Sequence, residues 1–192
     1  MRKAVHLLFL LILLAGLLVP SGNGSAAILK QYDAAYYQAS SMMRQMPPEE
    51  RIGQLFLVSF EGAKISPDSQ IVSLIAQKHI GGVVLRADNN NFVGPDNTAV
   101  TAQNLIESLQ TTGWESHQKS SNDQSTAGYV PLLIGINQEG DLYPYSQILS
   151  GITEIPAQMA VGATWNPEYS RTVGSILGSE LSALGFNLLF GP

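Results

Sequence analysis

The 192-residue sequence contains no cysteine. The lack of thiols excludes disulfide bonds, thiolate catalysis, cysteine-based zinc sites and attachment of a lipid at a cysteine. Histidine is also scarce, with three residues, and no spacing of His, Asp and Glu is typical of a metal site. The sequence also has no glycine motif of the kind that cradles phosphate groups. We therefore expect a protein that uses neither a metal nor an organic cofactor.

Charged residues are few, and basic residues are the rarer kind. Charged residues of both signs make up 13% of the chain, against about 25% in an average soluble domain. Acidic residues outnumber basic ones by 15 to 10, which gives a net charge of -5. Nucleic-acid binding needs a clustered basic surface, so this balance argues against a nucleic-acid partner. The hydrophobic fraction of 45% is sufficient for one domain with a core.

The first 27 residues have the three-part pattern of a signal peptide. Arg2 and Lys3 precede an apolar run, and small side chains that suit cleavage follow it. An uncleaved membrane anchor is the rival interpretation, since the run lies near the lower length limit for spanning a bilayer. We expect a secreted or extracytoplasmic protein, cleaved after Ala26 or Ala27, that meets the membrane only through this export signal.

Strand and helix signals alternate along the rest of the chain. We interpret residues 28–46 as a helical lead-in and residues 47–192 as part of one α/β domain. The expected strands cover residues 55–60, 83–85, 131–136 and 186–190. The expected helices cover residues 34–46, a short segment opening at Pro48, a segment from Ser66-Pro67-Asp68 to Gly81-Gly82, residues 97–112, and a segment from Asn166-Pro167-Glu168 to Gly185. Proline at the first helical position with an acidic neighbour supports these starts.

The intervening stretches predict loops. Residues 113–129 are polar and predict an exposed insertion. The run Asn89-Asn90-Asn91 is typical of a loop tip. The strand at 55–60 lacks alternation, which indicates a strand covered on both faces.

The alternation of strands and helices implies parallel strands joined by right-handed crossovers. Two architectures use this pattern: a barrel that closes with eight strands, and an open doubly wound sheet of five or six strands. Ligands gather at the carboxyl ends of the strands in both. The candidate site therefore comprises residues 86–92 and 137–145.

Five segments then occur in an order that resembles the family 3 glycoside hydrolases, in their β-N-acetylhexosaminidase branch. They begin with Glu-Arg-Ile-Gly-Gln-Leu-Phe at 50–56 and Ile-Gly-Gly-Val-Val-Leu at 80–85. Pro-Leu-Leu-Ile-Gly-Ile-Asn-Gln-Glu-Gly at 131–140 follows. Ile-Pro-Ala-Gln-Met-Ala-Val-Gly-Ala-Thr at 155–164 and the helix and strand signals at 178–187 complete the set.

The resemblance covers the chain from about residue 46 onward. It implies a (β/α)₈ barrel of the TIM type, of which the chain would be the first half. It also implies a carbohydrate substrate and retaining hydrolysis of β-linked amino sugars. The sequence gives no indication of the oligomeric state.

The chain departs from the family where the sugar is held. Asn137 stands where the family has an aspartate that binds sugar hydroxyls, and Leu142 stands where an arginine is expected. An asparagine can still accept and donate hydrogen bonds, but it lacks the charge-assisted bonds of a carboxylate. The resemblance therefore implies substrate contacts at Asn137, Asp141 and Tyr143. Asp141 could supply some of the polar contacts that the missing pair would make.

Other side chains have alternative interpretations. Tyr143 and Tyr145 could stack against a sugar ring, whereas Trp165 and Tyr169 are expected in the core. Arg86 is interpreted as a surface arginine. For Gln138 and Glu139 we favour a structural role at the strand end. His79 is expected to cap a helix end, where positive charge suits the dipole.

Retaining glycosidases need a nucleophile and a proton shuttle, and neither role can be assigned to a residue of this chain. The resemblance implies that both lie further along the family's barrel. We therefore expect the 192-residue chain alone to be inactive and poorly stable. The alternatives for the parent protein are a catalytically inactive, exported glycan-binding barrel and an unrelated α/β binding protein with an open sheet.

Overall fold

The computed structural model describes residues 24–92, 94–121 and 128–191. The chain divides into two compact units between Arg44 and Gln45. Helix α2 (Gly24–Gln45) accounts for the described part of the first unit. It confirms the helix expected at 34–46 and begins earlier. Most of the expected signal peptide lies outside the described residues, and none of the helices that are described is long and apolar enough to cross a bilayer.

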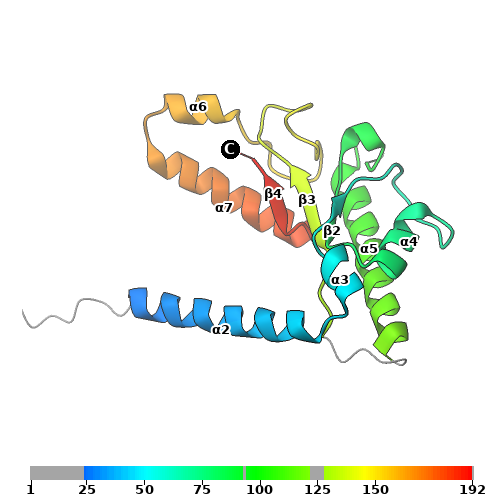
Figure 1. Ribbon diagram of the computed structural model, residues 1–192. Helices are drawn as coiled ribbons and strands as arrows, with labels where there is room; N and C mark the ends of the chain where they lie inside the picture. The colour runs from blue at the N-terminus through cyan, green and yellow to red at the C-terminus, as the bar shows by residue number, and fades with distance from the viewer. Residues whose placement is uncertain (1–23, 93, 122–127, 192) are drawn as a thin grey trace, which may run out of the picture. The chain divides into compact units, whose positions relative to one another are not determined.

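The second unit is built on a parallel sheet of four strands. These are β1 (Leu57–Val58), β2 (Gly82–Val84), β3 (Leu133–Asn137) and β4 (Leu188–Phe190). Each strand pairs with the next one along the chain, in the order β1-β2-β3-β4. Figure 1 shows β2, β3 and β4 side by side. The four expected parallel strands are therefore confirmed. The described sheet does not close on itself, and its order contains no reversal of the doubly wound kind.

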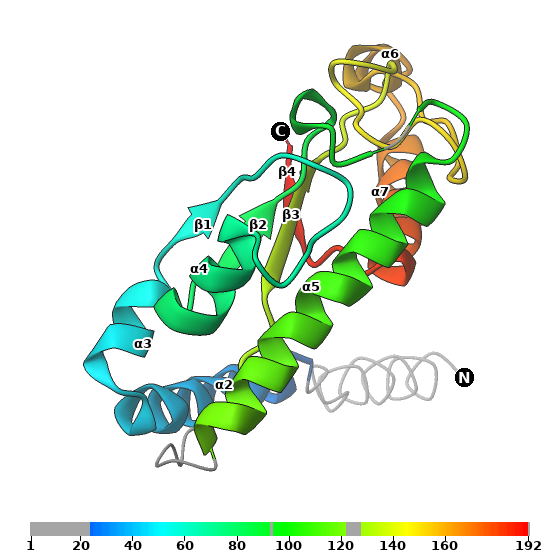
Figure 2. The same ribbon diagram turned by 90° about the vertical axis from the view of Figure 1, so that its right-hand side faces the viewer.

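Helices connect the strands and cover one face of the sheet. They are α3 (Pro48–Gly53), α4 (Gln70–Lys78), the 3₁₀ turn η1 (Ala87–Asn89), α5 (Thr98–Ser121), α6 (Gln158–Ala163) and α7 (Pro167–Leu184). Figure 2 shows α4 and α5 packed in front of β2 and β3. Val83, Ile134 and Ile136 point into this layer and are fully buried. They pack in one core with Ile71, Ile75, Ala102, Leu105, Ile106, Leu109, Leu177 and Leu181.

Within the second unit, no described helix packs on the other face of the sheet. Leu57, Leu133 and Phe190 expose 40%, 42% and 41% of their surface. The expectation that the first strand is covered on both faces is therefore wrong for the described structure, because the helices pack against one face only. The strand is also shorter than expected, since Leu55 and Phe56 precede it and are exposed.

The start and end of α4 differ from the prediction. The N-cap is Ser69 rather than a residue at the predicted start. The hydroxyl of Ser69 donates to the carbonyl of Ser66 at 2.7 Å, so the segment that begins at Ser66 forms a turn before the helix. The helix ends at His79, in the left-handed conformation (φ 53°), rather than at the paired glycines. Gly82 belongs to β2, and Gly81 allows close approach of α3, because a Cβ there would lie 2.2 Å from the carbonyl oxygen of Gln54. His79 thus occupies the helix end as expected.

Helix α5 continues well past its expected end at residue 112. The helix runs to Ser121, so the prediction of an exposed insertion over 113–129 is wrong for 113–121. The rings of Trp114 and Tyr129 meet edge-on, with centroids 5.1 Å apart, and His117 packs beside both. This aromatic contact holds the extra turns of the helix, and the polar composition of the segment does not reveal it. The rest of the predicted insertion lies partly outside the described residues.

Helix α7 follows its sequence signals closely. The side chain of Asn166 accepts a hydrogen bond from Glu168 N at 3.1 Å, and Gly185 ends the helix at φ 98°. Trp165 and Tyr169, however, are 93% and 55% exposed, so the expectation that they lie in the core is wrong. The first turns of α7 project beyond the sheet toward α6 (Figure 1), where no described layer covers them.

Candidate active site

A cavity of about 420 Å³ opens at the carboxyl ends of the parallel strands. The loops that follow β2 and β3 line it, as the sequence predicts, together with the end of β4. The lining residues are Val84, Arg86, Asn137, Glu139, Pro144, Gln147, Phe190 and Gly191. This is the position at which parallel α/β folds bind their ligands.

Asn137 is the last residue of β3 and pairs in register with Phe190. Its side chain lines the cavity, and its Oδ1 atom is buried without a hydrogen-bond partner among the described residues. Leaving a buried acceptor unpaired costs about 1–3 kcal/mol. A donor from a ligand in the cavity would remove that cost. The sugar contact predicted for Asn137 stays a prediction, and its position on the wall is compatible with it.

Gln138 supports the loop rather than the cavity. The residue exposes 3% of its surface. Its Nε2 donates to the Ile148 carbonyl at 3.0 Å, and its Oε1 accepts from the N–H groups of Gln147 and Ile148. The structural role favoured for Gln138 is therefore confirmed. Glu139 differs, because it lines the cavity and its carboxylate makes no hydrogen bond to the described residues. Only its backbone N–H is tied, to the Tyr145 carbonyl at 2.9 Å.

Two buried amides fasten the strand-end loops to one another. Gln147 Oε1 accepts from Ala87 N at 2.7 Å, and Gln147 Nε2 donates to the Pro144 carbonyl at 2.9 Å. Asn91 Oδ1 accepts from Arg86 N at 2.8 Å, while its Nδ2 donates to the carbonyls of Phe60 and Gly62. The loops after β1, β2 and β3 are thus joined.

The prediction that the three asparagines form a loop tip is wrong for Asn91. The residue is completely buried. The reason is the bend of the loop after β2, which leaves backbone groups of two strand-end loops facing inward. Only a side chain with both a donor and an acceptor can satisfy them together.

An exposed cluster on the rim joins the β2 and β3 loops a second time. The Asp88 carboxylate accepts a hydrogen bond from the Tyr143 hydroxyl and pairs with Arg86 Nη2 at 3.0 Å. The hydrogen bond from Tyr143, and secondarily the one from Arg86, holds the pKa of Asp88 below its ordinary value. The same bond raises the pKa of Tyr143, because the phenolate would face a carboxylate. Asp88 was not predicted from the sequence, where its only signal is its place in a strand-end loop.

The remaining predicted contacts lie on the loop rather than on the cavity wall. Asp141 and Leu142 adopt the left-handed conformation at φ 61° and 58°, which is uncommon for residues other than glycine. Backbone bonds from Asp141 N to the Ile155 carbonyl (3.3 Å) and from Ser146 N to the Leu142 carbonyl (2.6 Å) hold this turn. Tyr143 is half exposed and directs its hydroxyl to Asp88. Substrate contacts at Asp141 and Tyr143 stay predictions.

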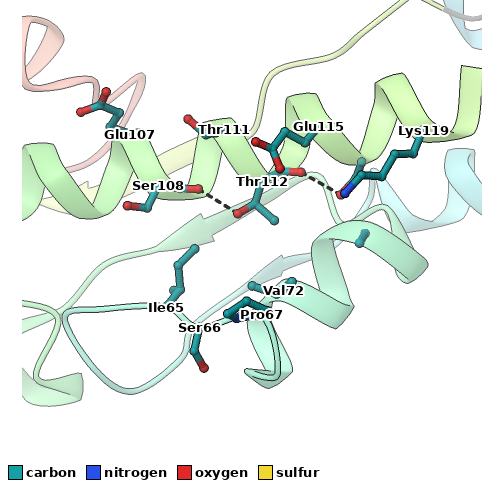
Figure 3. Close-up of a pocket in the computed structure, with 12 residues that line it drawn as sticks. Ile65, Ser66, Pro67, Val72, Glu107, Ser108, Thr111, Thr112, Glu115 and Lys119 are labelled. Atoms are coloured by element: carbon teal, nitrogen blue, oxygen red, sulfur yellow. Dashed lines mark hydrogen bonds between the residues drawn. The ribbon is translucent and has the colours of Figure 1, made fainter.

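A second hollow, of about 710 Å³, lies between α4 and α5 on the outside of the helix layer. Figure 3 shows Ile65, Pro67 and Val72 on one side and hydroxyl groups of α5 on the other. The hydroxyl of Thr112 donates within its own helix, to the Ser108 carbonyl at 2.8 Å. Within the ranges that the structure describes, no cluster of three or more His, Cys, Asp or Glu side chains could hold a metal ion.

Comparisons with known proteins agree with this geometry. Residues 48–192 match the glycosyl hydrolase family 3 N terminal domain. A "Beta-N-acetylglucosaminidase/beta-glucosidase" of Cellulomonas fimi is 30% identical over 151 residues, which are 78% of this chain and 21% of that protein. A "Beta-hexosaminidase A" of Pseudoalteromonas piscicida is 30% identical over 126 residues, which are 64% of this chain and 18% of that protein.

Among solved structures, a glycoside hydrolase family 3 β-N-acetylglucosaminidase from Paenibacillus sp. str. FPU-7 superposes with a TM-score of 0.61 and 33% identity. The match covers 77% of this chain and 24% of that one. The chain thus spans between a sixth and a quarter of the length of these relatives. With its four parallel strands, its strand-end cavity and these matches, the chain belongs to glycosyl hydrolase family 3 and carries part of that family's N-terminal domain.

Proposed function

We propose that the protein to which this chain belongs is an exported glycosidase that hydrolyses β-linked sugars, with N-acetylated amino sugars as the first candidates. The carrying observation is the cavity at the strand ends, whose wall includes Asn137 with an Oδ1 atom that no described residue satisfies. Sugar hydroxyl groups can donate to such an atom. The names of the relatives from Cellulomonas fimi and Paenibacillus support the choice of sugar.

We further propose that the four strands are half of a (β/α)₈ barrel. The pairing of each strand with the next supports a barrel over a doubly wound sheet, in which the strand order reverses. The uncovered face also supports it. Leu57, Leu133 and Phe190 point away from the helices and suit the packed interior of a barrel.

The described residues that line the cavity are better suited to binding a sugar than to cleaving it. Retaining hydrolysis requires two groups that flank the glycosidic bond, commonly carboxyl groups about 5–5.5 Å apart. Glu139 supplies the only carboxylate among the described residues that line the cavity. We therefore assign no catalytic residue here. Asn137 would accept from a sugar hydroxyl and donate through its amide, and Val84 and Phe190 would offer an apolar surface to the ring.

The proposal is tested with the full-length protein and two substrates, an aryl β-N-acetylglucosaminide and an aryl β-glucoside. We expect turnover of the first, with a lower kcat/KM for the second. Absence of turnover on both, by a folded sample, contradicts the glycosidase proposal. Asn137 and Leu142, which replace the polar pair that the family uses, favour a second candidate, an inactive glycan-binding barrel. Saturable binding of a chito-oligosaccharide without turnover would select it.

Export has its own test. We propose that the first 26 or 27 residues direct secretion and are then removed, which the basic start, apolar run and small residues of the sequence support. The mass of the protein recovered outside the cytoplasm should correspond to a chain that starts at Ala27 or Ile28. An intact Met1 on membrane-bound protein would select the anchor instead.

A further inference from the structure

We propose that Arg86 is the cationic substrate-binding residue of this site and that Asp88 and Tyr143 position it. The inference rests on the proposed function and goes further, because it assigns a substrate contact to the loop after β2. The sequence favours a surface role for Arg86, whereas the structure places it on the cavity wall with Asn137 and Glu139.

The guanidinium of Arg86 has hydrogen-bond donors that no described residue uses. Its Nη2 pairs with Asp88 at 3.0 Å, while its Nε and Nη1 atoms make no hydrogen bond to the described residues. The side chain is 54% exposed, so a ligand in the cavity can reach it. A planar fork that matches two adjacent oxygen atoms would combine Nη1 with the second N–H of Nη2. Neighbouring hydroxyls of a pyranose, or a hydroxyl and an amide carbonyl, present such a pair.

The base of the Arg86 side chain is held from two directions. Its own N–H donates to the buried Asn91 at 2.8 Å, and the next residue, Ala87, donates to the buried Gln147 at 2.7 Å. The backbone that carries Arg86 is thus fastened to the loops after β1 and β3. A residue anchored in this way loses little further freedom when it binds a ligand.

The tip of the side chain is held by Asp88 and Tyr143. Asp88 accepts from Arg86 through Oδ2 and from Tyr143 through Oδ1, so the carboxylate is shared between the two loops. Leu142, which stands next to Tyr143, cannot supply the cation that the family resemblance implies at that position. The geometry provides a cation from the neighbouring strand instead.

The experiment uses the full-length protein and compares Arg86→Gln with Arg171→Gln. Arg171 is a matched control, because it is an exposed arginine on α7 that pairs with Glu168 at 3.7 Å, outside the residues that line the cavity. We expect Arg86→Gln to raise KM for the aryl glycoside by about 10- to 100-fold, the range for a charged hydrogen bond. Arg86→Lys should lie between the wild type and the glutamine variant, and Arg171→Gln should leave KM within about twofold.

One substitution at Tyr143, made in two backgrounds, separates positioning from stacking. Tyr143→Phe keeps the ring and removes the bond to Asp88. If Tyr143 positions Arg86, we expect the Phe variant to raise KM about 3- to 10-fold with kcat nearly unchanged. In an Arg86→Gln background the same change should add almost nothing, because the residue it positions is gone. Additive effects, or a Phe variant equal to the wild type, would overturn the positioning role.

The outcomes also separate this inference from the proposed function. If the wild type turns over neither aryl glycoside, the glycosidase proposal fails, and the same variants are then compared by their affinity for a chito-oligosaccharide. If the wild type binds or cleaves sugar and Arg86→Gln equals Arg171→Gln, the role of Arg86 is refuted while the function stands. Thermal unfolding of each variant, unchanged from the wild type, verifies that a loss is not a loss of folding.

Discussion

The Oδ1 atom of Asn91 accepts a hydrogen bond from the backbone N–H of Arg86 at 2.8 Å, inside a loop that buries Asn91 completely. The Nδ2 atom of the same side chain donates to two carbonyl groups that follow β1, each at 3.0 Å. One amide therefore satisfies three backbone groups, and it connects the two strand ends beside the cavity.

Replacement of Asn91 by alanine should destabilise the protein clearly. The change leaves one donor and two acceptors without their partner beside a buried position, and each buried group left unsatisfied costs about 1–3 kcal/mol. Because relaxation and water entry will offset part of this, we expect a loss of about 3 kcal/mol in the free energy of unfolding. Asn104→Ala, at an exposed position of α5, is the control and should change it by less than about 0.5 kcal/mol. Denaturant unfolding of the full-length protein measures both, and equal values would contradict the role of Asn91.

Asn137→Ala should weaken sugar binding without lowering the stability of the protein. The variant removes a buried oxygen that has no partner among the described residues. We therefore expect the free energy of unfolding to stay the same or rise by up to about 1 kcal/mol. Affinity for the sugar should fall about tenfold, since the acceptor for a ligand hydroxyl is lost. A variant that loses both stability and affinity would show that Asn137 is structural.

The titration of Asp88 reports the contact with Tyr143. Its pKa is held below the ordinary value of 3.8, first by the hydrogen bond from Tyr143 and then by the one from Arg86. Because the pKa of Asp88 is lower in the folded state, its ionised carboxylate stabilises the protein fully at pH values above the pKa of the unfolded state. This stabilisation is lost as the pH falls through the pKa of the folded state. Tyr143→Phe should raise the pKa of Asp88 toward 3.8, and by more than Arg86→Gln does. Carboxyl ¹³C NMR titration checks the order, and the reverse order would contradict the arrangement of the rim.

Gly135 should be intolerant of a methyl group. A Cβ at this position would lie 2.7 Å from the ring of Phe190 on the adjacent strand. Overpacking of this kind costs about 1–3 kcal/mol, so Gly135→Ala should lower the free energy of unfolding by that amount. Gly174 on α7 has no atom within 4 Å of its would-be Cβ. Gly174→Ala should instead stabilise the helix by about 0.5–1 kcal/mol, and thermal unfolding of the pair tests the contrast.

Much of the fold and some of the site follow from local patterns. The strand positions, the N-cap at Asn166 and the glycine that ends α7 depend on residues close in sequence, so the sequence alone predicts them. Asn137 was predicted at the end of a strand, and it lies there. The extra turns of α5 were missed, because they depend on a contact between Trp114 and Tyr129 across the polar segment.

The sequence by itself determined the alternation of strands and helices and indicated the family, and it predicted departures from the family at Asn137 and Leu142. Only the tertiary structure decided that one face of the sheet is uncovered, that Asn91 is buried, and that Arg86 lines the cavity. It also paired Asp88 with Tyr143, which stand 55 positions apart in the chain. Such contacts form where loops from different strands converge, and the geometry of that convergence is set by packing of the whole sheet rather than by any local pattern.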